Sequence, residues 1–351
     1  MRKSKRVRDA LCPVAMGILL FVMFARLWPT GADWYYTFYH TARAWIAGET
    51  RLYDGEASRG FYLMPWGVFI LAPLALLPLQ WGQAILSTVT LGALLLAVLA
   101  VSEKPPTLLV VILAMANLHT FDVLIRGNVD ALPLLGLALG WLGLQKRKSL
   151  LLGVGLWLLA VKPVNVILPA IVLLWGMRYW TRQEIAWALW APGLSLLLSF
   201  SLFGLDWPIR YVTMWRADPP LTYLQTSLWR AIKAAGLPRL AAYLAAIPAC
   251  ILALWQVWRR GAMSATLALA ITTNLLFTPY ALGSHYVLLA IPFVILASQY
   301  RLTVLTWFLT LTPLLRLRFG FDVAWIDAGY PLVLWLFSWA ALLRAEDAKS
   351  C

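Results

Sequence analysis

The chain has 351 residues, of which 62% are hydrophobic and 13% charged, and its mean hydropathy is +0.76. Soluble domains carry about 25% charged residues, so this composition excludes an ordinary soluble protein. It predicts a single polytopic membrane domain over residues 1–351. The net charge of +14 comes from short Lys and Arg clusters beside apolar segments. That pattern favours topology signals and contacts with anionic lipid, and no nucleic-acid partner is expected.

Three cysteines, Cys12, Cys250 and Cys351, are far apart and show no CxxC spacing. The sequence therefore supports neither a disulfide framework nor a zinc site.

The first apolar segment, 11–28, follows the strongly basic residues 1–8 and lacks a small-residue cleavage site. We expect an uncleaved span with its N-terminus in the cytoplasm. Residues 30–64 then form a first external loop that is rich in Trp and Tyr, with a short interfacial helix expected over 33–47.

The rest of the chain alternates between apolar segments and short polar breaks. Residues 150–177 are expected to form a hairpin of two short helices with Lys162 near its tip, and 205–237 a second external loop. The basic run 145–148 is expected on the cytoplasmic side of the membrane. If every preceding segment crossed the bilayer, this run would lie on the opposite side, so either 65–78 or 107–118 is expected to be re-entrant or interfacial. In all, 11 to 13 membrane segments are predicted in an all-α protein, the others being 81–101, 131–144, 185–203, 240–258, 263–277, 287–297, 302–315 and 331–343.

Asp33 lies just beyond the first span among aromatic residues. A carboxylate in such a partly desolvated setting can have a raised pKa and act as a general base. The alternative is that Asp33 caps the helix that begins at Trp34. Asp54, in the turn Tyr53-Asp54-Gly55, is interpreted as a turn residue.

Lys162 interrupts an otherwise apolar stretch and precedes Pro163. A lysine at such depth usually faces an internal cavity, where it would suit a phosphate. The alternative is that its ammonium reaches the interface from a helix end.

A polar group precedes the segment 131–144 and contains Arg126, Asn128 and Asp130. It is either an ion or sugar site or an Arg–Asp pair that ties a loop. His285 is either a ligand contact or a structural hydrogen-bond partner. Arg210 and Arg216, which lie among aromatic residues of the second loop, could bind a phosphate and a sugar or could simply be solvated.

Several short motifs, in order across about 260 residues, resemble glycosyltransferase family 87, membrane enzymes of the GT-C fold. The first loop contributes Gly31-Ala32-Asp33, Tyr36, Leu52-Tyr53-Asp54 and Phe61-Tyr62, and the next segment Ala72-Pro73-Leu74. Later matches are Arg126-Gly127-Asn128-Val129-Asp130, Ala160-Val161-Lys162-Pro163, Gln225-Thr226-Ser227-Leu228, Thr278-Pro279-Tyr280 and His285-Tyr286. Asn128 stands where the family has Gln, and Asp130 where it has Asn.

The resemblance implies a GT-C-like bundle and a transferase of the hexosyltransferase type, similar to mannosyltransferases. Asp33 would be the catalytic base that deprotonates an acceptor hydroxyl, and a polyprenyl phosphate sugar would be the donor. The donor's phosphate or sugar would contact Lys162, His285, Arg126, Asn128, Tyr36 and Tyr62. No cofactor and no metal are expected, because fixed cations can neutralise the leaving phosphate.

The expected partners are thus the lipid-linked donor, a lipid or glycan acceptor and the bilayer, with the site on the extracytoplasmic side of the cell membrane. The alternative function is a transporter or lipid flippase, although such proteins usually contain internal repeats and this sequence has no visible repeat. A third possibility is a non-catalytic membrane assembly factor.

Overall fold

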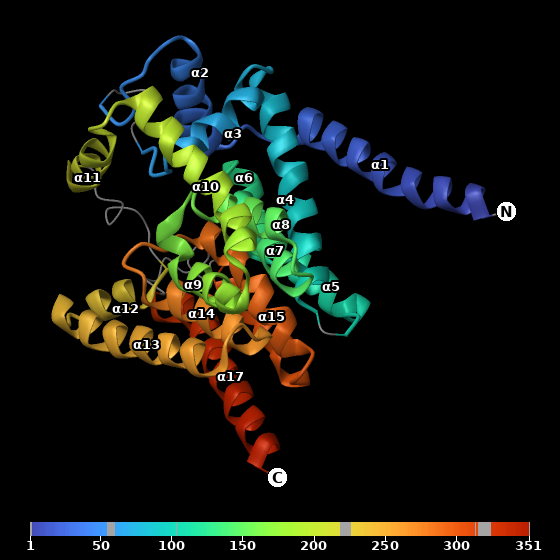
Figure 1. Ribbon diagram of the computed structural model, residues 1–351, viewed down its shortest axis with the longest axis vertical. Coiled ribbons are helices and arrows are strands. Elements are labelled where there is room, and N and C mark those ends of the chain that lie inside the picture. The colour runs from blue at the N-terminus through green and yellow to red at the C-terminus, as the bar shows by residue number, and fades with distance from the viewer. Residues whose placement is uncertain are drawn as a thin grey trace.

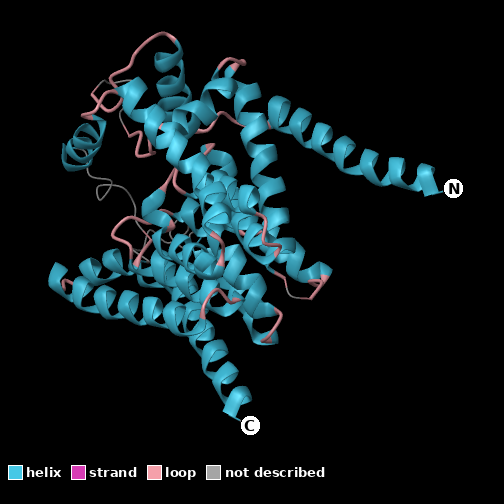
Figure 2. Cartoon of the chain, viewed as in Figure 1, coloured by secondary structure: helices cyan, strands magenta, loops and turns pink. Residues whose placement is uncertain are grey.

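A computed structural model describes residues 2–54, 60–102, 104–217, 226–312, 314 and 324–350. Within these ranges the chain is helical and contains no strand (Figure 2). The prediction of an all-α protein is confirmed for this part of the chain.

The helices of the first half begin with α1 (Arg2–Leu27), the π-helix η1 (Trp34–Tyr39) and α2 (His40–Ile46). They continue with α3 (Trp66–Ala75), α4 (Leu79–Val101), α5 (Leu108–Met115), α6 (Leu118–Arg126), α7 (Ala131–Gln145), α8 (Ser149–Leu159), η3 (Pro163–Asn165) and α9 (Ile167–Gly176).

The second half contains η4 (Met177–Tyr179), α10 (Arg182–Phe203), α11 (Trp207–Ala217), α12 (Leu228–Ala234), α13 (Arg239–Arg260) and α14 (Ser264–Phe277). It ends with η6 (Gly283–Leu289), α15 (Ala290–Ala297), η7 (Arg301–Leu311) and α17 (Ala324–Ser350). In Figure 1, α1 points away from the body of the molecule, while α2, α3 and α11 lie together at one end.

Four of the described helices are long and apolar enough to cross a membrane: α4, α10, α13 and residues Ile326–Arg344 of α17. The pair α5 and α6 would add a fifth span, bent by 42° at its break. On α10 the exposed side chains include Trp187, Trp190, Leu194 and Leu197. An apolar face of this kind is unfavourable in water and is expected where a helix contacts lipid.

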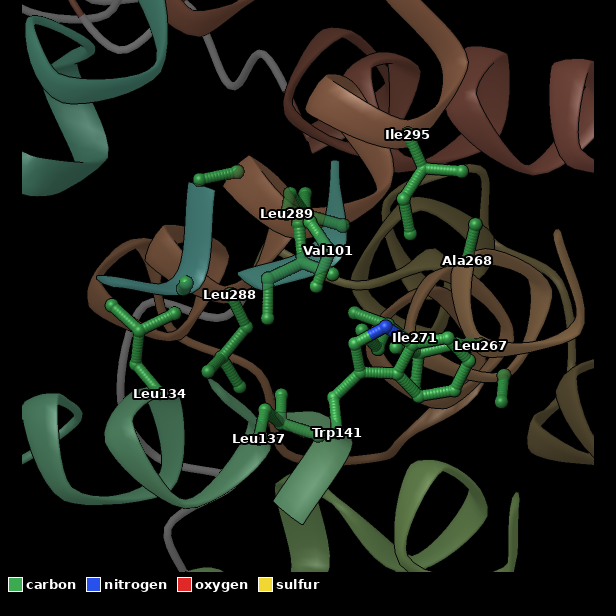
Figure 3. Close-up of a cluster of buried hydrophobic side chains, with 14 of the residues drawn as sticks. Val101, Leu134, Leu137, Trp141, Leu267, Ala268, Ile271, Leu288, Leu289 and Ile295 are labelled. Atoms are coloured by element: carbon green, nitrogen blue, oxygen red, sulfur yellow. The ribbon is translucent and has the colours of Figure 1, made fainter. Parts of the chain in front are cut away.

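The main hydrophobic core lies where α4, α7, α14 and α15 meet (Figure 3). Its buried side chains include Val101, Leu134, Leu137, Trp141, Leu267, Ala268, Ile271, Leu288, Leu289 and Ile295.

Helices α7 and α8 approach each other closely enough for their backbones to touch. A Cβ added to Gly155 would lie 2.4 Å from the Gly140 nitrogen, and one added to Gly136 would lie 2.7 Å from the Gly155 oxygen. Small residues permit such close helix pairs in membranes. Because the two helices are antiparallel neighbours, the start of α7 and the end of α8 come together, and the polar residues beside both ends meet there.

Segment 65–78 contains α3, whose 10 residues are too few to cross a bilayer, which agrees with the expectation that 65–78 or 107–118 is re-entrant or interfacial. The sequence-based segments differ from the structure at two places. The polar stretch after residue 118 is not a break, because its residues form α6. The second loop, 205–237, contains α11 and α12, and its residues 218–225 lie outside the described ranges. Residues 316–323, between the predicted segments 302–315 and 331–343, lie outside them too.

Residues 150–177 contain two short helices, α8 and α9, with Lys162 between them, as predicted. The predicted helix over 33–47 is present as η1 followed by α2.

Candidate functional site

A cavity of about 280 Å³, lined by both polar and apolar side chains, lies where the first loop meets the chain that follows α6, α8 and α14. It is lined by Asp33, Thr37, Phe38, Gly60, Tyr62, Leu63, Arg126, Asn128, Lys162, Tyr280, Leu282 and Gly283. Five of the residues proposed from the sequence therefore share one cavity, although they are spread over about 130 positions of the chain.

Asp33 is half-buried at the start of the first-loop helix. Its side chain makes no capping hydrogen bond to that helix, so the capping interpretation is wrong. Instead, Oδ2 of Asp33 accepts a hydrogen bond of 2.8 Å from the Asn128 amide. Burial raises the pKa of Asp33 above 3.8, while the Asn128 amide, Arg126 and Lys162 act in the opposite direction. A carboxyl with a raised pKa suits proton transfer near neutral pH.

The chain before Asp33 is fixed against α4 and the end of α6. Gly31 donates its N–H to Oε1 of Gln83 at 2.9 Å, and Nε2 of Gln83 donates to the Pro29 carbonyl at 3.1 Å. A Cβ on Gly31 would lie 2.2 Å from the Arg126 backbone. Gly127 ends α6 in the left-handed conformation, with φ of +64°. The turn therefore places Asn128 beside Asp33.

Lys162 is buried directly after α8. Its ammonium lies 2.7 Å from Oδ1 of Asp130 and 3.3 Å from Oδ1 of Asn128. The interpretation of a lysine that reaches the interface is therefore wrong. The backbone nearby is tied to the first loop, because Met64 donates its N–H to the Val161 carbonyl at 2.9 Å.

Arg126 lines the cavity with a side chain that is 48% exposed, and it pairs with Asp122 at 2.7 Å. The alternative of a pair between Arg126 and Asp130 is wrong, because Arg126 pairs with Asp122 and Asp130 pairs with Lys162. The two cations of the cavity are thus held by separate carboxylates.

His285 and Tyr36 lie outside the cavity lining. His285 is fully buried, its Nδ1 accepts a hydrogen bond from the Leu282 N–H at 3.1 Å, and its Nε2 is 3.8 Å from Oδ2 of Asp130. This geometry favours the structural interpretation of His285. Tyr36 is 70% exposed and packs edge-on against Tyr35.

An aromatic wall is formed by Tyr62 and Tyr280, which line the cavity, and by Trp215, which packs against both rings outside the lining. The ring centroids of Tyr62 lie 6.0 Å from Tyr280 and 5.2 Å from Trp215, and those of Trp215 and Tyr280 are 5.6 Å apart. Such faces can stack against a sugar ring. Tyr280 belongs to the motif Thr278-Pro279-Tyr280, but only the fold brings its ring opposite Tyr62.

Arg210 ties the second loop to the first. Its guanidinium lies 3.5 Å from Oδ2 of Asp54, 3.2 Å from Oδ1 of Asp206 and 3.4 Å from the Leu52 carbonyl. The side chain is only 11% exposed, so the interpretation of a solvated residue is wrong for Arg210. Its contacts are those of a structural tie between the loops.

Among the described residues, no group of three or more His, Cys, Asp or Glu side chains is gathered where it could hold a metal ion. The cavity instead offers one carboxylate, two cations, an amide and tyrosine rings. This set can take up a proton, bind an anionic group and pack against a ring.

Comparisons with protein-family models, with curated proteins and with solved structures gave no match for this chain. The resemblance to glycosyltransferase family 87 therefore stays a prediction that rests on the motifs themselves.

Proposed function

We propose that the protein is an integral membrane glycosyltransferase. It transfers a hexose such as mannose, or a pentose, from a polyprenyl phosphate to a lipid or glycan acceptor. One observation carries the proposal: a half-buried carboxylate, Asp33, shares a cavity with the cations of Lys162 and Arg126 and with the tyrosines of the aromatic wall. The finer architecture belongs to the same proposal, namely a GT-C-like bundle of 11 to 13 membrane segments with a cytoplasmic N-terminus and an extracytoplasmic site in the cell membrane.

The reaction follows from these groups. Asp33 takes the proton of an acceptor hydroxyl, and the oxygen attacks the anomeric carbon from the face opposite the phosphate. The bond between the anomeric carbon and the phosphate oxygen breaks, its electron pair stays on that oxygen, and the configuration inverts. Lys162 and Arg126 stabilise the leaving polyprenyl phosphate. Asp33 loses its charge as the phosphate departs, which limits the repulsion between the two anions.

The remaining residues have supporting roles in the proposal. Asn128 holds Asp33, and Tyr62 and Tyr280 pack against the sugar. His285 acts on the phosphate site only through the buried group around Asp130. Tyr36, on the exposed side of η1, would contact a part of the donor that extends beyond the cavity. No metal takes part in this scheme.

The test is transfer of radiolabelled sugar from a panel of synthetic polyprenyl phosphate sugars into membrane lipid by purified protein. We expect incorporation by the wild type and none by Asp33→Asn. Asp206→Asn is the matched control, because Asp206 is an exposed carboxylate of the second loop outside the cavity, and it should keep full transfer.

Absence of transfer with every donor, in wild-type protein that elutes as a single folded species, would contradict the proposal. The transporter or flippase alternative would then be tested by lipid and solute flux in vesicles. Transfer retained by Asp33→Asn would instead remove Asp33 from the reaction and leave the activity in place.

A further inference from the structure

The Asn128 amide lies between two charged groups of opposite sign. Its Nδ2 donates to Oδ2 of Asp33 at 2.8 Å, and its Oδ1 faces the Lys162 ammonium at 3.3 Å. An ammonium can only donate and a carboxylate can only accept. Lys162 therefore favours the amide orientation in which the N–H group points toward Asp33. The Asp130 N–H adds a second donor to Asn128 Oδ1 at 3.2 Å.

Lys162 is itself held from behind by Asp130. Their N–O distance is 2.7 Å, and the Asp130 side chain is completely buried. Asp130 does not line the cavity, so it cannot act on a substrate there by contact. Its other carboxylate oxygen is 3.8 Å from Nε2 of His285. The carboxylate thus anchors the ammonium on the side away from the cavity.

We propose that Asp130 is a positioning residue for the base: it fixes Lys162, and Lys162 fixes the Asn128 amide in the orientation that donates to Asp33. This inference rests on the proposed function, in which Asp33 is the base. Through the chain Asp130, Lys162, Asn128 and Asp33, a buried residue outside the cavity controls how firmly Asp33 holds its proton.

The charged groups that act on Asp33 come from several elements. Arg126 and Asp122 belong to α6, and Lys162 follows α8. Asp130 precedes α7 and faces Lys162 and His285. Any test must therefore separate the simple effect of a lost charge from the effect of a lost position.

The direction in which the titration midpoint of Asp33 moves in Asp130→Asn separates these two effects. Loss of a negative charge alone makes a neighbouring carboxyl more acidic, so a pure charge effect of Asp130→Asn lowers the titration midpoint of Asp33. Loss of position acts in the opposite direction, because Asp33 then loses the hydrogen bond that stabilises its ionised form. We expect the midpoint to rise.

The measurement is the titration of Asp33 by NMR, in full-length protein labelled with ¹³C at the aspartate carboxyl carbons. Its signal is identified by its disappearance in Asp33→Asn. Asp122→Asn is the matched control, because it removes a nearby carboxylate that lies outside the chain of contacts. In this variant the titration midpoint of Asp33 should fall. A fall or no change in Asp130→Asn would overturn the proposal.

If Asp130→Asn does not fold, because it leaves the Lys162 ammonium buried without its carboxylate, the variant Asp130→Asn/Lys162→Met removes both charges. The effect of Asn128→Ala on the Asp33 midpoint is then measured in the wild type and in this background. We expect a smaller effect in the background, where the amide has lost its orientation. Equal effects in the two backgrounds would overturn the proposal.

Neither measurement needs a donor or an acceptor. A chain of contacts that behaves as expected in protein without transferase activity would keep the positioning role and reject the proposed function. Transferase activity in the wild type, together with a lowered titration midpoint of Asp33 in Asp130→Asn, would keep the proposed function and reject the positioning role.

Discussion

The ammonium of Lys162 lies 2.7 Å from Oδ1 of Asp130, and the two side chains are 6% and 0% exposed. This pair joins the end of α8 to the start of α7, with Lys162 lining the cavity and Asp130 outside its lining. Removing one partner of a buried pair leaves the other charge uncompensated, whereas removing both can be nearly neutral. The pair is therefore a sensitive point for stability as well as for the proposed chemistry.

Lys162→Met is expected to lower the free energy of unfolding by about 3–5 kcal/mol, because it leaves the Asp130 carboxylate buried without its cation. The measurement is denaturant unfolding in detergent micelles. Asp130→Asn/Lys162→Met should recover most of the loss. Arg147→Gln is the control, since the pair of Arg147 and Glu184 lies at the surface, and it should cost much less. If Lys162→Met and Arg147→Gln lowered the free energy of unfolding by the same amount, the role given to burial would be contradicted.

Gly31→Ala is expected to lower the free energy of unfolding by about 1–3 kcal/mol, because the added Cβ overlaps closely packed backbone. That Cβ would lie 2.2 Å from the Arg126 carbonyl carbon. Gly92→Ala is the matched control, because its Cβ would meet nothing within 4 Å on α4. It should raise the free energy of unfolding by about 0.5–1 kcal/mol. Thermal unfolding measures the stability of both variants. If Gly31→Ala left the free energy of unfolding unchanged, the close approach of Gly31 to the Arg126 backbone would be contradicted.

Asp33→Asn is expected to raise the thermal stability at neutral pH and to leave it unchanged in strong acid. The folded-state pKa of Asp33 is raised above 3.8 by burial, so folding favours the protonated carboxyl. Its contribution is fully present below the unfolded pKa and is lost as the pH rises through the folded pKa. The measurement is the melting temperature of the wild type and of Asp33→Asn from strong acid to neutral pH. A variant that is less stable than the wild type at neutral pH would contradict this sign.

Transfer by the wild type should rise with pH as the same carboxyl ionises, because only the ionised form can accept the acceptor's proton. The acid limb of kcat/KM is expected above the ordinary pKa of aspartate. The check is the pH profile of sugar transfer with a fixed donor. An acid limb at or below 3.8, the ordinary value, would contradict the assignment of Asp33 as the base.

Tyr280→Leu is expected to lower kcat/KM for the donor by a factor of about 2 to 10, since a stacked aromatic ring contributes about 0.5–1.5 kcal/mol. Tyr179→Leu is the control, because Tyr179 is 77% exposed and lies outside the cavity. It should leave transfer unchanged. Tyr36→Leu tests the residue proposed from the sequence, and a loss as large as that of Tyr280→Leu would place Tyr36 in the donor site.

Much of the fold and part of the cavity follow from local patterns. The apolar segments predict α4, α10 and α13 because helix length must match the bilayer. Asp33, Arg126, Asn128 and Lys162 stand out as charged or polar groups among apolar residues. Local patterns could not give the helical state of residues 118–126, because α6 is amphipathic and its polar side chains resemble a break. Nor could they place Tyr280, which meets Tyr62 across more than 200 residues of the chain.

By itself, the sequence determined that the chain is apolar, that the part described by the structure is helical without strands, and that a few ionisable residues interrupt the apolar segments. Composition and periodicity decide these properties because each depends on neighbouring residues only. The tertiary structure alone decided which of those residues meet. The close approach of α7 and α8 pairs Lys162 with Asp130, and the turn at Gly127 turns Asn128 toward Asp33. Partners of this kind are fixed by the packing of distant helices, which no local pattern encodes.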